Sequence, residues 1–174
     1  MRNKWFVFAA FVAILLGISS SANAQAKRKA RLDMEAFRYE IECVGIGTQG
    51  TYLIKVWTYS KKPKVAIAQS KKNAVHGIIF KGFSGGGQGC TSQKALAPSI
   101  DVQDENPDFF EGFFDDRGDF NKYVAVSGDG AIDSEDRLKV GKEYKIGVVV
   151  SVMKDQLRKD LEKAGVIKGL DSGF

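Results

Sequence analysis

Apolar and polar side chains alternate along residues 37–46, and residues 51–59 are rich in β-branched and aromatic side chains, with large groups on both faces of the expected strand. Alternation with a period of two is typical of a β-strand that buries one face. Gly47 and Gly50 lie between the segments and allow a tight reversal of the backbone. The pattern therefore predicts an antiparallel hairpin.

The period changes after Pro63. Residues 65–75 carry apolar side chains at helical spacing, which predicts a helix. A short apolar run at residues 78–80 then predicts a third strand. We expect residues 51–80 to form strand, helix and strand in that order.

A glycine-rich loop, residues 83–90, precedes the second half of the chain. Asn106 and Pro107 predict the start of a second helix, along which phenylalanines follow at helical spacing. Residues 120–127 are rich in apolar and aromatic side chains and predict a strand.

The last part of the chain contains the clearest alternation. Residues 138–152 contain a turn at Gly141, after which side chains alternate from Tyr144 onward and predict a strand. Residues 154–163 predict a terminal helix with a narrow apolar stripe. The resulting order is β-β-α-β-loop-α-β-β-α. It indicates an α+β fold, in which helices pack on one face of an antiparallel sheet.

The first residues have the pattern of a secretory signal peptide. Arg2 and Lys4 precede an apolar run at residues 5–18, and Ala22 and Ala24 then form a site of the kind that signal peptidase cleaves. The run is shorter than the roughly 20 residues that a membrane span needs, so we expect the protein not to span a membrane. After cleavage behind residue 24 the protein is expected to be periplasmic or extracellular.

The remaining chain is long enough for a single domain, which we place at residues 37–168. Residues 25–36 begin with a run of basic side chains and predict a mobile basic leader. Residues 169–174 are expected to form a frayed C-terminus.

Charge is unevenly distributed along the chain, whose formal net charge is +5. Residues 101–136 carry twelve acidic side chains against the basic Arg117 and Lys122. So acidic a block, together with export, argues against a nucleic acid partner. A bipolar surface suits self-association or a charged protein partner.

Two cysteines and one histidine are the reactive side chains that the sequence offers. Cys43 and Cys90 either form a disulfide, or Cys43 is a free thiol buried on its strand. His76 lies near the predicted end of the first helix, where interaction with the helix dipole is the simpler explanation. Catalysis by Cys90 with His76 is the alternative. A single histidine excludes a cysteine–histidine zinc site.

No catalytic or cofactor motif is complete. Gly89 is followed by Cys90 where a phosphate-binding Walker loop needs lysine, and the many acids of residues 101–136 single out no catalytic pair. The sequence therefore predicts a protein that is not an enzyme and holds no cofactor.

A small-ligand or glycan site is the alternative function. It would combine two aromatic side chains of the second strand with the glycine-rich loop, since long loops often carry binding residues. The candidate residues are Trp57, Tyr59, Gly85, Gly86, Gly87, Gln88 and Gly89.

Weak calcium binding is a further alternative. Asp129, Asp133 and Asp136 match three positions of an EF-hand loop, but Ala125 stands where the first carboxylate belongs. A simple turn explains the segment better.

The unit from Gly47 to Ile79, a strand followed by a helix with Ala66, Ala68 and Ala74, resembles small cell-envelope domains of the LPP20 and flagellar T-protein type. The whole chain further resembles uncharacterised exported envelope proteins of the Bacteroidota kind, although no lipidation cysteine stands at the cleavage point. The resemblance implies a role in the envelope or in assembly and names no site residue.

Together these features predict a non-enzymatic, exported cell-envelope protein that acts in protein–protein interaction or assembly. Its expected partners are other envelope proteins or further copies of itself.

Overall fold

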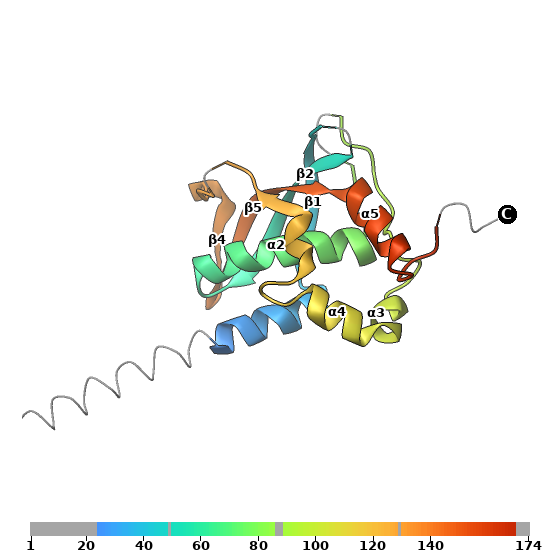
Figure 1. Ribbon diagram of the computed structural model, residues 1–174. Helices are drawn as coiled ribbons and strands as arrows, with labels where there is room; N and C mark the ends of the chain where they lie inside the picture. The colour runs from blue at the N-terminus through green and yellow to red at the C-terminus, as the bar shows by residue number, and fades with distance from the viewer. Residues whose placement is uncertain (1–23, 49, 86–88, 129, 170–174) are drawn as a thin grey trace, which may run out of the picture.

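Figure 1 shows the computed structural model, which describes residues 24–48, 50–85, 89–128 and 130–169. An antiparallel sheet is covered by helices on one face, so the predicted α+β fold is confirmed. The strands are β1 (Tyr39–Ile46), β2 (Thr51–Ser60), β3 (Val124–Val126), β4 (Arg137–Val140) and β5 (Glu143–Met153). The helices are residues 24–35, α2 (Pro63–Phe80), α3 (Asp101–Glu105), α4 (Pro107–Phe113) and α5 (Lys154–Lys163), and short 3-10 turns lie at Asp119–Lys122 and Ser134–Asp136.

The sheet is built around β2 and β5, which pair along the full length of β2. β1 pairs with the other side of β2 in the predicted hairpin, in a register that sets Cys43 opposite Ile54. The far side of β5 pairs with β3 near Val152 and with β4 near Ile146. β1 therefore forms one edge of the sheet, and the two short strands β3 and β4 share the other.

The core lies between the sheet and α2. Ile54 and Val56 on β2 are fully buried, and Ala66, Ala74 and Val75 on α2 are buried as completely. Small side chains on the helix allow its backbone to lie close to the sheet, and the branched side chains of the strands fill the remaining space. One connected hydrophobic cluster results, and it also includes Leu157 of α5.

Helix α2 is longer than predicted, and the strand predicted at residues 78–80 is wrong. The helix continues to Phe80, and every residue from Asn73 to Phe80 is buried. A short apolar run has no polar face, so its period cannot distinguish a buried strand from a fully buried helical end. Here the sheet on one side and α4 on the other bury the whole circumference, as the contact of Phe80 with Phe110 shows.

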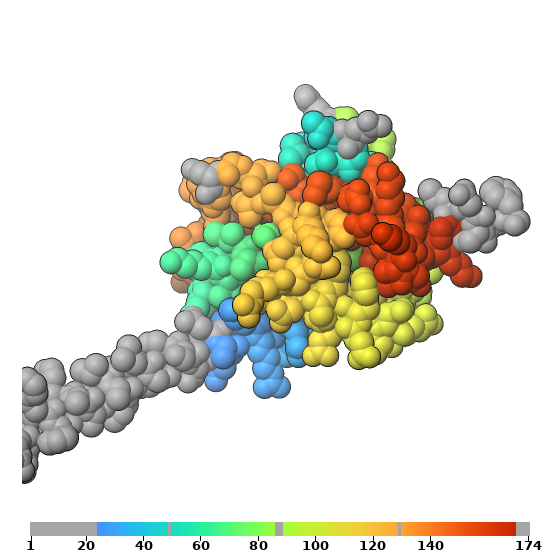
Figure 2. Space-filling model, in the orientation of Figure 1, coloured from blue at the N-terminus to red at the C-terminus, as the bar shows by residue number. Residues whose placement is uncertain are grey.

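The N-terminal segment also differs from the prediction, because residues 24–35 form a helix rather than a mobile basic leader. Ala30 and Met34, four residues apart, are each 3% exposed and hold the helix against the body. The basic side chains face outward, and Lys27 forms an ion pair with Asp116, which lies three residues after the end of α4. In Figures 1 and 2 this helix lies beside the segment that contains α3 and α4.

The strand predicted at residues 120–127 is shorter in the structure. β3 is only Val124–Val126, because Asp119–Lys122 turn so that Phe120 packs beside Phe114 in the core. The predicted turn at Gly141, the strand behind it and the terminal helix α5 are all present.

Two predicted segments lie at the ends of the chain. Residues 1–23 of the predicted signal peptide and residues 170–174 of the predicted frayed end lie outside the described residues. Within the described part of the chain, no helix is long and apolar enough to cross a membrane.

Candidate functional site

The face of the sheet that points away from α2 carries a cluster of aromatic and charged side chains. Alternation along β2 buries Ile54, Val56 and Thr58 and leaves Trp57 and Tyr59 half-buried on the opposite side. We call this opposite side the outer face. Antiparallel sheets commonly leave one face toward solvent, where side chains are free to meet a partner.

Trp57 is positioned by a glycine on the neighbouring strand. Gly147 of β5 is its cross-strand partner, and a Cβ at Gly147 would lie 3.0 Å from Cζ3 of the indole. Because Gly147 has no side chain, the indole ring of Trp57 can lie across the backbone of β5. Trp57 Nε1 donates a hydrogen bond of 3.0 Å to Oε1 of Glu42 on β1, which fixes the direction of the ring.

Cations surround the two aromatic rings. The ammonium groups of Lys55 and Lys145 lie 5.6 and 5.1 Å from the centroid of the Trp57 ring, within reach of cation–π attraction. The guanidinium of Arg38 lies 4.6 Å from the centroid of Tyr59.

Each of these cations also has an acidic partner. Lys145 Nζ lies 2.8 Å from Oε1 of Glu40 and Lys55 Nζ lies 2.8 Å from Oδ1 of Asp136. The hydrogen bond to Asp136 raises the pKa of Lys55, so its charge persists on the face. Arg38 bonds Glu143, and that hydrogen bond raises the pKa of Arg38.

Strand β4 extends the outer face to the edge of the sheet. All four of its residues are exposed, and the apolar Leu138 and Val140 are each 46% exposed. Leu138 lies opposite Lys145 in the β4–β5 register, so these apolar side chains belong to the same face as Tyr59, which lies opposite Lys145 on its other side. We call Trp57, Tyr59, Leu138 and Val140 the outer patch.

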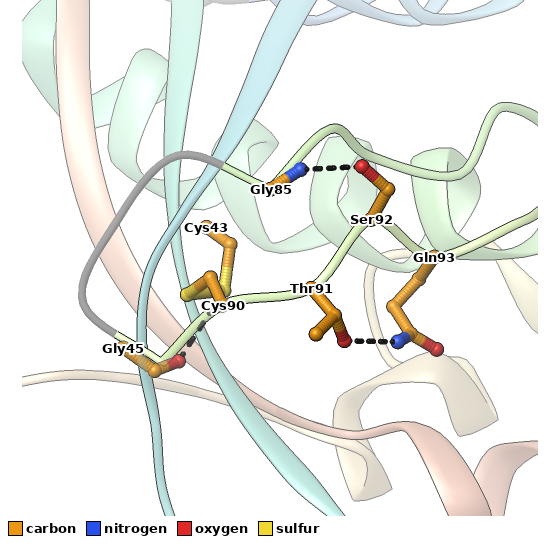
Figure 3. Close-up of a disulfide and its surroundings, with 7 residues drawn as sticks. All are labelled: Cys43, Gly45, Gly85, Cys90, Thr91, Ser92 and Gln93. Carbon is orange, nitrogen blue, oxygen red and sulfur yellow. Dashed lines mark hydrogen bonds between the residues drawn. A yellow bond between two sulfur atoms is a disulfide. The ribbon is translucent and has the colours of Figure 1, made fainter.

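The opposite edge of the sheet is partly covered. Ser84 forms a parallel bridge with Glu42 of β1, and Cys90 forms a disulfide with Cys43, whose Cα lies 5.9 Å from that of Cys90 (Figure 3). Ser92 Oγ accepts a hydrogen bond from the backbone of Gly85 and further orders the loop. Ser84 and the disulfide therefore cover the edge at β1 around Glu42 and Cys43, whereas the described part of the chain leaves the edge at β4 open.

The predicted ligand site is divided between the two faces of the sheet. Trp57 and Tyr59 lie on the outer face, whereas Cys43 is buried on the core face and ties Cys90 and the adjoining loop to that side. Gly85 and Gly89 are exposed beside the β1 edge, and Gly86, Gly87 and Gln88 lie outside the described residues. The structure does not bring the aromatic pair and the described loop residues into one groove.

The three candidate calcium ligands are not gathered in the described structure. Asp136 is buried and paired with Lys55, Asp133 is exposed, and Asp129 lies outside the described residues. Among the residues that are described, no group of three or more acidic, histidine or cysteine side chains could hold a metal ion.

His76 lies inside α2 rather than at its end, because the helix continues to Phe80. The side chain is completely buried, and Nδ1 lies 2.7 Å from the hydroxyl of Tyr39 while Nε2 lies 3.1 Å from Oε1 of Gln103. Both contacts are satisfied when the neutral ring accepts from Tyr39 and donates to Gln103. Burial lowers the pKa of His76 to about 4. With Cys90 held in the disulfide, the two side chains do not form a nucleophile and base.

A second surface feature is a half-open groove of about 1070 Å³ between residues 24–35, α2 and α4. Asp116 lies between Lys27 and Lys72 at 2.7 and 2.9 Å, which lowers the pKa of Asp116 to about 2. Cations on the N-terminal helix and on α2 thus pair with Asp116, which follows α4 in the chain. These ion pairs neutralise part of the charge that lines the groove.

Several contributors to the outer face could not be found from sequence alone. Arg38, Lys145 and Gly147 join Trp57 and Tyr59 only through cross-strand register. The alternation in residues 138–152 predicted that β4 and β5 have two faces, but not which strand lies beside β2. The partners of β2 were therefore the missing information.

Comparisons of the chain with protein-family models, with curated proteins and with solved structures give no match. The structure itself defines the class of protein: an α+β protein whose sheet has one face covered by helices and one open face. The resemblance to envelope domains stays a prediction.

Proposed function

We propose that this chain is an exported, non-enzymatic protein that binds another protein through the outer patch. The observation that carries the proposal is the arrangement of the sheet. Trp57, Tyr59, Leu138 and Val140 share its uncovered face and reach its open edge, while helices cover the other face and a disulfide-anchored loop covers the edge at β1.

The composition of the outer patch suits a protein partner. Tryptophan, tyrosine and arginine dominate the binding energy of many protein interfaces. The two aromatic side chains bury a large area at low entropic cost. Arg38 stacks on Tyr59, and the ion pairs around the rings restrain their rotamers before a partner arrives. Less side-chain conformational entropy is then lost on binding.

A glycan ligand is less well supported by this geometry. Sugars bind aromatic rings by stacking on a free face, whereas the Trp57 indole lies against Gly147 and within 5.6 Å of two ammonium groups. We therefore keep protein binding as the proposed function.

Export is supported by two independent features. The first 24 residues have the pattern of a signal peptide, and Cys43 and Cys90 form a disulfide, a bond that is rare in reducing compartments. The resemblance to envelope domains agrees with this compartment.

Site-specific photo-crosslinking tests the proposal. The protein is produced in the cells that encode it, with p-benzoylphenylalanine in place of Leu138 on the outer face or of Lys163, which is exposed on α5. We expect a discrete adduct of higher mass from position 138 and none from position 163. Equal adduct patterns from the two positions, or no adduct from position 138, would contradict the proposed function.

A further inference from the structure

Strand β4 is an edge strand of the sheet, and its cationic and apolar residues alternate. Among the described strands it pairs with β5 alone, so the backbone N–H and C=O groups on its other side lack a strand partner. Exposed edges of this kind are templates for an added strand, and they normally require protection. Here the edge at β1 is covered and the edge at β4 is open.

Cationic and apolar side chains alternate along this edge. Leu138 and Val140 belong to the outer patch, and Arg137 and Lys139 lie on the other face of the strand. Arg137 stacks on Tyr144 with 4.7 Å between its guanidinium carbon and the ring centroid. In the part of the chain that the structure describes, neither Arg137 nor Lys139 forms an ion pair, in contrast with Lys55 and Lys145.

We infer that β4 binds an extended, acidic segment of the partner protein, which adds one strand to the sheet. In this arrangement the backbone of the segment bonds the free edge. Its acidic side chains face Arg137 and Lys139, and its alternate apolar side chains continue the outer patch beside Leu138 and Val140. This inference rests on the proposed function and specifies the partner that the outer patch would accept.

A second copy of the chain is a poorer occupant. When two β4 strands pair antiparallel with their apolar residues on a common face, each cation of one copy lies opposite a cation of the other. Like charges directly opposite each other destabilise a strand pair, whereas opposite charges stabilise it. The charges of β4 thus discourage self-pairing and favour an acidic strand.

Two synthetic peptides of equal length and apolar content test this inference. Both are capped octapeptides that alternate a charged residue with valine or threonine, one with glutamate and one with lysine at the charged positions. Each is titrated at low salt into the isotope-labelled protein without residues 1–24, and the backbone amides of β4 are followed by nuclear magnetic resonance. We expect the glutamate peptide to shift the amides of residues 137–140 and to bind about tenfold more tightly than the lysine peptide, which corresponds to two reversed charge pairs.

Charge reversal and backbone blocking separate strand addition from general attraction. In the double variant Arg137→Glu with Lys139→Glu, the preference should invert toward the lysine peptide. The variant Lys159→Glu with Lys168→Glu has the same net charge change at exposed positions away from the sheet and should keep the original preference. A glutamate peptide that is N-methylated at alternate residues loses backbone donors and should bind at least about tenfold more weakly.

Three results would overturn the inference: equal binding of both peptides, an undiminished affinity of the N-methylated peptide, or a concentration-dependent shift of the β4 amides in the protein alone. The third result would assign the edge to a second copy. If a discrete adduct forms at position 138 and any of these results is also found, the proposed protein binding still holds. Only the inference that β4 binds an acidic strand is then contradicted. Absence of the adduct at position 138 would contradict the proposed function itself.

Discussion

Gly147 and Trp57 lie opposite each other on β5 and β2, so closely that a Cβ at Gly147 would stand 3.0 Å from the indole Cζ3. The same Cβ would lie 3.1 Å from Oδ1 of Asp136, which is paired with Lys55. One absent side chain therefore makes room for both an aromatic ring and a partly buried ion pair of the outer face.

Replacing Gly147 by valine should displace the Trp57 ring. We expect the free energy of unfolding to fall by about 1–3 kcal/mol, because the branched side chain forces the indole and the Asp136 carboxylate from their positions. Trp57 emission should shift to longer wavelength as the ring becomes more exposed. Protein without residues 1–24 contains no other tryptophan, so its fluorescence reports on Trp57 alone.

Gly112→Ala is the matched control for that substitution. A Cβ at Gly112 in α4 meets no atom within 4 Å. Alanine is the better helix former, so stability should stay unchanged or rise by up to about 1 kcal/mol, with no change in Trp57 emission. A loss of stability equal to that of Gly147→Val would contradict the steric explanation.

The disulfide should stabilise the fold and close the edge at β1. In the double variant Cys43→Ala with Cys90→Ala, we expect the free energy of unfolding to fall by about 2–5 kcal/mol, since the bond joins residues 47 positions apart. Amide hydrogen exchange should accelerate in β1 and in the loop around Ser84, and much less in β5. Uniform acceleration through the whole sheet would show that the bond does not protect this edge specifically.

The N-terminal helix should contribute to stability through one buried side chain. Met34 is 3% exposed, whereas Leu32 on the same helix is 49% exposed. Met34→Ala should lower the free energy of unfolding by about 2–5 kcal/mol, and Leu32→Ala by no more than about 0.5 kcal/mol. Chemical denaturation measures both, and equal small effects would mean that residues 24–35 do not pack on the body in solution.

Acid should destabilise the protein through His76 before the carboxylates contribute. The pKa of His76 is about 4 in the folded protein and 6.5 ordinarily, so the unfolded chain binds more protons between these values. Stability is therefore fully present above about pH 6.5 and is lost as the pH falls toward about 4, by roughly 3 kcal/mol. Asp116, whose folded pKa is about 2, contributes only at lower pH.

Unfolding in urea at several pH values between about 7 and 5 measures this dependence. His76 is the only histidine in the chain, so the non-titrating variant His76→Gln should show a nearly flat profile over that range, whatever its absolute stability. An unchanged slope in the variant would assign the pH dependence to other groups.

Local periodicity predicted much of the fold. Alternation predicted β1 and β5, β-branched and aromatic content predicted β2, and an apolar stripe predicted α5; all four elements are confirmed. The same signal failed at residues 78–80 and 24–35. The first is apolar on all sides. The second packs through Met34, which joins a core cluster made mainly of residues distant in sequence.

By itself, the sequence determined which residues alternate, where the chain turns and that Trp57 and Tyr59 share one face of β2. These properties depend on neighbours within a few residues, which the sequence displays directly. Tertiary structure alone decided that Gly147 makes room for the ring of Trp57 and that Lys145 pairs with Glu40. It also decided that the disulfide to Cys90 ties a loop to the edge at β1, while the edge at β4 stays open. Strand order and register set these contacts, and they arise from the packing of the whole sheet against α2, which no local pattern encodes.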